Sequence, residues 1–335
     1  SLESKYGQDT NASSSYPTFY ENLLDINLYL DDLYMFAQLE YSNPPIMGVS
    51  KRKLSDALNT VYLQYFNERY DIMVGNLYLM YGQGLSLHTF QDQNIDYDNS
   101  LYGFESIYHI NNNLDFYTVA GKKNIKSRKA SQEIVPSITI DNRLFSLGVQ
   151  NSLDRWNMHF ISMFYQQDYD SSDILKISGL PTILGNYVEN TFPIESIDDN
   201  YSMDNLEHNI GFSYFGDYFE ISYEKSFVYY NKLLSERESG YREYLGWYTN
   251  IFDFNIILEH KDYYTPYLYS LFANPPIVYR ESNSILTSRN IHSLNVNNEY
   301  GFQFEVNKEF ETGLNFLFNY AFAMHYIEDE AINQP

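Results

Sequence analysis

Apolar and polar residues alternate along much of this chain, and this period of two constrains the fold more than any other feature of the sequence. It is clear near the N-terminus, where Leu24, Ile26 and Leu28 alternate with Asp25 and Asn27. The same pattern returns at residues 219–224, 252–259, 302–307 and 314–322. Successive side chains of a β-strand point to opposite faces of the sheet, so the pattern predicts strands with one apolar and one polar face.

The predicted strands are joined by connections of two kinds. We expect about 14 antiparallel strands of roughly nine to eleven residues, a length that crosses a bilayer when the strand is tilted. Tight polar turns are predicted at residues 31–32, 67–69, 111–113, 152–154, 216–217, 249–250 and 308–309. Longer polar connections span residues 43–58, 82–100, 123–141, 167–205, 231–240 and 261–298. Short and long connections alternate, as in outer-membrane barrels, which predicts an all-β, antiparallel up-and-down transmembrane β-barrel.

Composition agrees with this fold and excludes several classes of function. The 21 Lys and Arg residues against 44 Asp and Glu give a net charge of -23, which repels nucleic-acid phosphates. The absence of cysteine excludes disulfides and thiolate metal sites. No segment approaches the roughly 20 consecutive apolar residues of a membrane-spanning helix. A mean hydropathy of -0.43 fits a barrel, because its strands alternate apolar with polar residues.

A glycine-punctuated segment follows one predicted strand. It begins at Gly75 and Asn76, continues through Tyr81, and contains Gly82 and Gly84. The two later glycines relieve side-chain crowding, so the backbone can turn or bulge as it leaves the sheet. An alternative interpretation is that the loop folds into the lumen as a constriction.

Two sets of motif residues resemble a known family. The first set is Gly75, Asn76, Tyr81, Gly82 and Gly84 with Asp92, Asp98, Asn99 and Gly103. The second is Asn274, Pro275, Pro276 and Ile277, followed by Arg280, Glu281 and residues 286–289. Together they resemble an uncharacterised family of outer-membrane barrels from Bacteroidota and related bacteria, a domain of unknown function. The resemblance covers most of the chain and implies a barrel in the outer membrane with no known activity.

No catalytic constellation is recognisable in the sequence, and we expect no enzyme activity and no cofactor. Ser86, His88 and Asp92 lie near one another, but no nucleophile-elbow motif frames the serine. Asp96 and Asp98 alternate along a loop and are weak calcium candidates, although the EF-hand pattern fails. The seven histidines show no metal-binding spacing.

The sequence leads to one domain assignment and one expectation about the chain ends. Residues 1–20 are interpreted as a polar loop or N-terminal remnant, and residues 21–335 as the barrel. If the short turns are periplasmic, the first strand, near Asn22, and the last, near Leu314, leave both ends outside the cell. Bacterial barrels normally start and finish in the periplasm, so we expect this chain to be part of a larger barrel of about sixteen strands or more.

The predicted function is an integral outer-membrane β-barrel of a Gram-negative bacterium, acting as a cation-favouring pore, a transporter or a surface scaffold. Its expected partners are membrane lipid and lipopolysaccharide, with divalent cations bridging acidic loops to phosphates. The alternative is a secreted soluble β protein that binds glycans through its tyrosines. In the barrel, Phe252, Phe254, Ile256 and Leu258 should face lipid, while Asp253, Asn255 and Glu259 face the lumen.

Overall fold

The structure is a computed structural model that describes residues 1–8, 18–41, 57–92, 97–127, 138–169, 201–231, 237–264, 273, 276 and 298–325. Its strands are β1 (Leu2–Gln8), β2 (Thr18–Leu30), β3 (Leu33–Glu40), β4 (Leu58–Phe66), β5 (Tyr70–Leu77), β6 (Gln91–Asp92), β7 (Tyr97–Asp98), β8 (Leu101–Asn111), β9 (Leu114–Ser127), β10 (Ile138–Leu153), β11 (Trp156–Tyr169), β12 (Tyr201–Phe215), β13 (Phe219–Asn231), β14 (Arg237–Ile251), β15 (Phe254–Tyr264), β16 (Asn298–Glu309) and β17 (Asn315–His325). In these segments we find no helix long and apolar enough to cross a membrane.

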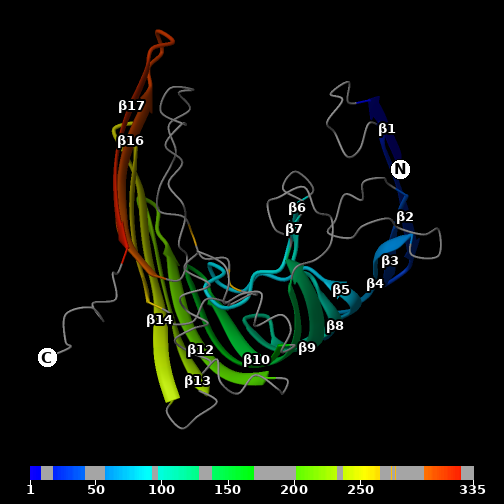
Figure 1. Cartoon of the computed structure of the whole chain (residues 1–335). Helices are drawn as coiled ribbons and strands as arrows, with labels where there is room; N and C mark the ends of the chain where they lie inside the picture. Colours follow the sequence, from blue (N-terminus) through cyan, green and yellow to red (C-terminus); the bar gives the residue numbers. More distant parts are fainter. Residues whose placement is uncertain are drawn as a thin grey trace, which may run out of the picture.

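All strands except β6 and β7 form one antiparallel sheet of 15 strands in sequence order, which confirms the predicted up-and-down topology. The sheet curves into an open trough with β1 and β17 at its two edges (Figure 1). The strand that contains Asn22 pairs with β1 and β3, and β17 pairs with β16. Among the described residues β1 and β17 are not bonded to each other, so the described sheet is not a closed barrel.

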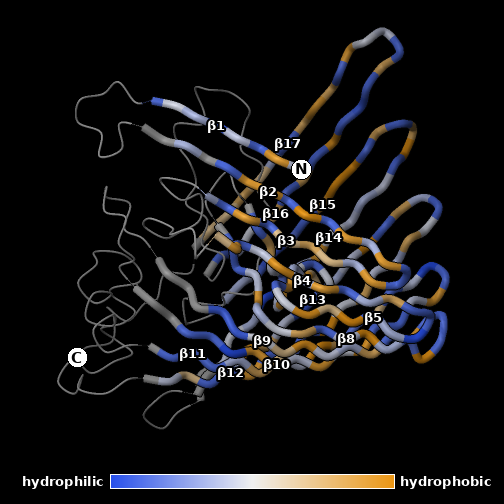
Figure 2. The backbone as a smooth tube through the Cα atoms, turned by 90° about the vertical axis from the view of Figure 1, so that its right-hand side faces the viewer, coloured by the Kyte–Doolittle hydropathy of each residue, from blue (hydrophilic) through white to orange (hydrophobic). Residues whose placement is uncertain are grey.

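Short and long connections alternate along the sheet, as predicted. Figure 2 shows the short turns gathered at one end of the strands. Asp31 and Asp154 occupy turn positions with φ of 47° and 41°, a conformation that Asp tolerates better than most residues. The turn expected at residues 249–250 instead lies at Phe252 and Asp253, whose φ angles are 53° and 61°. The turn expected at 308–309 follows β16 at residues 310–314.

The 15 strands of the sheet agree with the prediction of about 14. Two further expectations need correction. Residues 1–20 are not a loop throughout, because β1 pairs with β2 in a register that places Leu2 opposite Leu24. Phe252 and Asp253 do not belong to the alternating strand, because they form the turn between β14 and β15.

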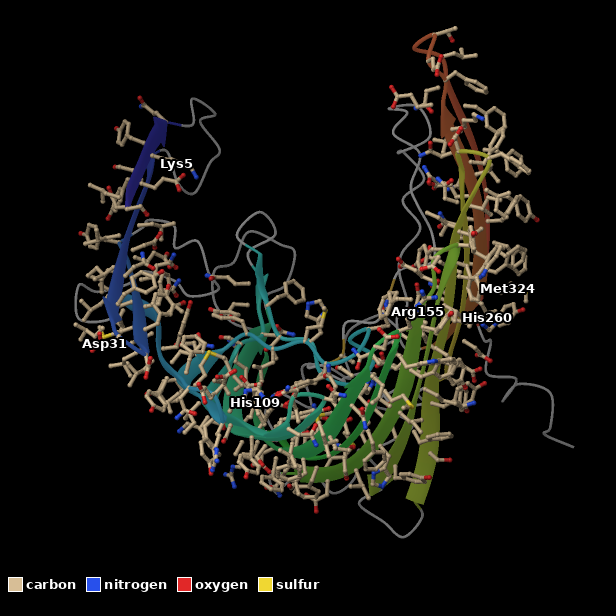
Figure 3. The ribbon with its side chains drawn as sticks, turned by 180° about the vertical axis from the view of Figure 1, so that it is seen from behind. Lys5, Asp31, His109, Arg155, His260 and Met324 are labelled. Carbon is tan, nitrogen blue, oxygen red and sulfur yellow. The ribbon has the colours of Figure 1, made fainter. Side chains whose placement is uncertain are left out.

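The two faces of the sheet differ in chemistry. The convex face exposes large apolar side chains on almost every strand, including Leu28, Phe145, Leu147, Phe160, Phe164, Leu206, Ile210, Phe227, Leu245, Leu258, Phe316, Phe318 and Tyr320. Figure 3 shows His260 and Met324 on this outer side. Residues adjacent to these in sequence, such as Ser146, Ile161 and Glu207, are buried on the concave face. On β15, Leu258 is exposed and Glu259 accepts a hydrogen bond from Tyr244, as the predicted alternation requires.

Candidate functional site

An inner loop, residues 78–90, lies against the concave face of the sheet. It follows β5 and crosses the inside of the trough, where it is drawn in cyan in Figure 1. Its Leu79, Tyr81 and Leu87 are buried in one apolar cluster with Ile161 and Met163 of β11. Burying one leucine side chain, compared with leaving it exposed to water, stabilises the folded chain by about 1.5–3 kcal/mol. Hydrophobic burial therefore holds the loop on the concave face.

The inner loop folds back on itself as a short hairpin. The Tyr81 amide donates to the Leu87 carbonyl at 3.0 Å, and the Thr89 amide donates to the Leu79 carbonyl at 2.7 Å. Gly82 and Gly84 form the tip with φ of 60° and 80°, a left-handed conformation that favours glycine. A Cβ atom at Gly82 would overlap the side chains of the sheet beneath it. Glycine therefore permits both the turn and the close approach to the sheet.

Glu224 of β13 binds the tip of the inner loop. Its carboxylate accepts hydrogen bonds from the backbone amides of Gln83 and Leu85, the latter at 3.3 Å. It also accepts one from the side-chain amide of Asn209 at 2.7 Å. The Glu224 side chain is only 1% exposed. A buried carboxylate needs such donors, because an unpaired charge away from water is costly.

Arg242 of β14 binds the same tip through a second contact. Its Nη1 atom donates to the Leu85 carbonyl and to Glu207 Oε1, each at 2.9 Å. Glu207 also accepts a hydrogen bond from the Ser226 hydroxyl. The Arg242 and Glu207 side chains are 1% and 0% exposed, so this ion pair lies away from water. The loop tip is thus bound by an acidic and a basic side chain from neighbouring strands.

Tyr81 connects the inner loop to the opposite part of the concave face. Its hydroxyl donates to Glu105 of β8. Its ring stacks on Tyr117 of β9, with centroids 4.3 Å apart and an interplanar angle of 7°. Burial, and then the charge of Glu105, raise the pKa of the Tyr81 phenol above its usual range. The hydroxyl therefore remains a donor at neutral pH.

Two asparagines of the predicted motif hold the two ends of the inner loop. Asn76 accepts a hydrogen bond from the Val61 amide at 3.0 Å, where β5 ends. Asn99 accepts one from the Phe90 amide at 2.6 Å and donates to the His88 carbonyl at 3.0 Å. The motif therefore fixes the start and the end of a loop that does enter the trough.

The other glycines and the proline of the motif that the structure describes lie outside the inner loop. Gly75 of β5 and Gly103 of β8 lie opposite each other in the sheet. The Pro276 carbonyl accepts a hydrogen bond from the Tyr263 hydroxyl at 3.0 Å. Asn274 and Pro275 lie outside the described residues.

The structure describes some of the calcium candidates and some of the group formed by Ser86, His88 and Asp92. Asp98 accepts a hydrogen bond from the Ser100 amide at 2.7 Å and lies 3.3 Å from the Lys123 ammonium. Asp96 and the side chain of Asp92 lie outside what the structure describes. Within the described ranges, no three His, Asp or Glu side chains are grouped to hold a metal ion. Calcium at Asp96 and Asp98 stays a prediction. Ser86 is buried in the inner loop.

The residues that bind the loop tip could not be selected from the sequence. Alternation places both Glu220 and Glu224 on the polar face of one strand. In the structure Glu220 is exposed, whereas Glu224 lies beneath the inner loop. The same holds for Arg242, whose partner Leu85 lies far away in the sequence, and for Glu207, which pairs with Arg242. Only the course of the loop distinguishes these residues from other charged ones.

The sequence matches a family model described as a family of unknown function, DUF6029, over residues 3–178. This match covers more than half of the 335 residues, and the chain belongs to this family. The matched residues include β2–β11, all of β1 except Leu2, and the whole inner loop, but not Glu224 or Arg242. The comparison with curated proteins gives no match.

Several solved structures have a similar chain path. A BenF-like porin from Pseudomonas fluorescens is 9% identical, with 96% of this chain and 80% of that chain covered and a TM-score of 0.46. OmpF of Salmonella typhi is 10% identical, with 96% and 87% covered and a TM-score of 0.41. The channel DcaP of Acinetobacter baumannii is 12% identical, with 90% and 84% covered and a TM-score of 0.38.

Proposed function

We propose that this chain is an integral outer-membrane β-barrel protein of a Gram-negative bacterium, and that the inner loop narrows its lumen. The distribution of side chains between the two faces carries the proposal. Leu206, Phe227 and Leu258 are exposed on the convex face, whereas Glu207 and Glu224 are buried on the concave one. A water-soluble protein gains stability from the opposite arrangement, while a lipid-facing strand requires this one.

The inner loop fits the role of a fixed constriction better than that of a moving lid. Apolar burial, two amides bound to Glu224 and the Arg242 contact all oppose its release. Segments that open readily have few buried apolar contacts and exposed backbone hydrogen bonds. This loop has the opposite properties. We therefore expect the inner loop to stay in place, so that the width of the lumen at the loop does not change with time.

The net charge of -23 supports the further proposal that ions passing the lumen are mainly cations. A low-dielectric wall focuses the field of such charges, and salt screens it. Reversal potentials across a planar bilayer under a potassium chloride gradient test this selectivity. Anion preference would contradict the cation selectivity, and no conductance by the reconstituted protein would contradict the pore itself.

The absence of cysteine allows a direct test of the two faces. Leu258→Cys places a thiol on the convex face, and Asn255→Cys places one on the concave face of the same strand. In lipid vesicles, a nitroxide attached to the Leu258→Cys variant should sense lipid-soluble relaxation agents. One attached to the Asn255→Cys variant should sense water-soluble agents. Equal access of water-soluble agents to both positions would refute the membrane orientation.

A secreted soluble β protein is the alternative, and extraction separates the two. A folded membrane barrel needs detergent in solution and usually migrates differently on detergent gels before and after boiling. A chain that is monomeric in plain buffer and shows no change of mobility would favour the soluble alternative.

A further inference from the structure

Four aromatic residues form a continuous aromatic strip across β2, β3 and β4: Tyr29, Tyr34, Phe36 and Tyr62. The Tyr29 and Tyr34 rings stack with centroids 4.6 Å apart. The Tyr34 and Tyr62 rings meet edge to face with centroids 5.8 Å apart. The Phe36 and Tyr62 rings stack with centroids 5.2 Å apart. Each ring therefore touches the next, and the strip crosses three strands without a break.

The aromatic strip lies on the concave face. Tyr62 packs against the apolar cluster beneath the inner loop, so its ring points into the trough. Tyr29 and Tyr34 flank the short turn at residues 31–32 and are paired in the sheet. Tyr29 is 71% exposed. The strip thus runs from the short-turn end of the strands, where its rings are most open, toward the inner loop.

A row of polar groups lies beside the aromatic strip on the same face. Asn27 accepts a hydrogen bond from the Tyr34 hydroxyl at 2.7 Å. Asp25 accepts one from the Gln38 amide at 2.9 Å, and Gln38 accepts one from Asn59 at 3.0 Å. A carboxylate oxygen can accept more than one hydrogen bond, and a tyrosine hydroxyl both donates and accepts. The Asp25 carboxylate also accepts a hydrogen bond from the Ser1 hydroxyl at 2.9 Å, and each of its oxygens can accept a further one.

We propose that the aromatic strip binds the pyranose rings of a linear oligosaccharide. A pyranose presents C–H groups on its flat faces and hydroxyls at its edge. Aromatic rings offer flat apolar surface to the former, and tyrosine adds a polar tip. Amide and carboxylate groups beside the rings suit the edge hydroxyls, as expected of a site with mostly apolar surface and a few placed polar groups. An apolar ligand would form no hydrogen bonds with the side chains of Asn27, Asp25 and Gln38.

A second stacked tyrosine pair provides the matched control. Tyr70 and Tyr108 stack across β5 and β8 with centroids 5.0 Å apart. Both are exposed, and alternation places them on the convex face, opposite Asp71 and Ile107. Cross-strand stacking stabilises both pairs alike. Only the concave pair is continuous with a longer strip and a polar row.

The test is calorimetric titration of the full chain in detergent micelles with maltohexaose and cellohexaose, and with sorbitol as a polyol that lacks a ring. We expect at least one hexasaccharide to bind and sorbitol not to bind. The double variant Tyr29→Leu and Tyr34→Leu should weaken binding at least about tenfold, which corresponds to roughly 1.4 kcal/mol. Tyr70→Leu should change the affinity less than about twofold on the same scale. Circular dichroism before titration establishes that each variant is folded.

Three results would overturn the proposal: neither hexasaccharide binds at millimolar concentration, sorbitol binds equally well, or Tyr70→Leu weakens binding as much as the double variant. If the double variant does not fold, Tyr29→Ser alone replaces it, because Tyr29 is the most exposed ring of the strip. The outcome is independent of the membrane location. A chain that inserts in lipid without binding sugar refutes only the strip, and a soluble chain that binds sugar refutes only the barrel.

Discussion

Arg242→Met should be among the most destabilising single changes in this chain. The guanidinium neutralises Glu207 and also donates to the Leu85 carbonyl, both at 2.9 Å. Methionine would leave the Glu207 carboxylate buried beside the Ser226 hydroxyl without the charge that compensates it. Removing one partner of a buried ion pair costs about 3–5 kcal/mol, because the other charge is left uncompensated.

Two further variants separate the buried charge from the mere loss of an arginine. Arg155→Met removes an exposed guanidinium that lies 2.9 Å from Asp217, and it should cost about 0–1 kcal/mol. Arg242→Met combined with Glu207→Gln removes both charges of the buried pair. Neutral replacement of a buried pair is often tolerated, so the double variant should recover most of the loss.

Urea unfolding in detergent micelles, followed by circular dichroism, measures these differences as shifts of the transition midpoint at constant slope. Conductance of the reconstituted Arg242→Met variant reports separately on the inner loop, whose Leu85 carbonyl loses the hydrogen bond from Arg242. The reasoning fails if Arg242→Met is no more destabilising than Arg155→Met. It also fails if the double variant is as unstable as the single one.

Three other substitutions test the inner loop and the two faces of the sheet. Gly82→Ala should destabilise the inner loop by about 1–3 kcal/mol or more, because the position has φ of 60° and a Cβ atom there would overlap neighbouring side chains. Hydrogen exchange measures this change, and the protection of the loop amides should fall. Tyr81→Phe should cost about 1–3 kcal/mol in urea unfolding by leaving Glu105 without this donor, and an unchanged midpoint would argue against the bond. Leu258→Arg should cost about 2–4 kcal/mol in lipid vesicles and Asn255→Arg much less; equal losses would contradict the assigned faces.

The sequence by itself determined the strands, most of the turns and the order of the sheet. Alternation of apolar and polar residues is a local property, as in Leu24, Ile26 and Leu28 with Asp25 and Asn27. It predicts a strand wherever the two faces of a sheet meet different environments. Short connections force the two strands of each hairpin to be antiparallel neighbours, and this needs no long-range information.

Turn positions were predicted wrongly where turn chemistry is weak. Phe252 and Asp253 adopt positive φ in the turn between β14 and β15, although phenylalanine is rare there and no glycine marks the site. Phe252 continues the apolar alternation, so the pattern placed it in the strand. The pairing of β14 with β15, from Ile251 opposite Phe254 onward, decides the register instead.

The tertiary structure alone decided which charged residues form the site. Glu224 and Glu220 are indistinguishable by alternation, but the Gln83 amide, 141 positions away in the sequence, reaches only Glu224 of the two. Burial of a charge requires partners to arrive from several strands and from the inner loop at once. A local pattern fixes the face on which a side chain lies, whereas the path of a distant segment fixes whether that side chain meets water, and only the folded chain contains that path.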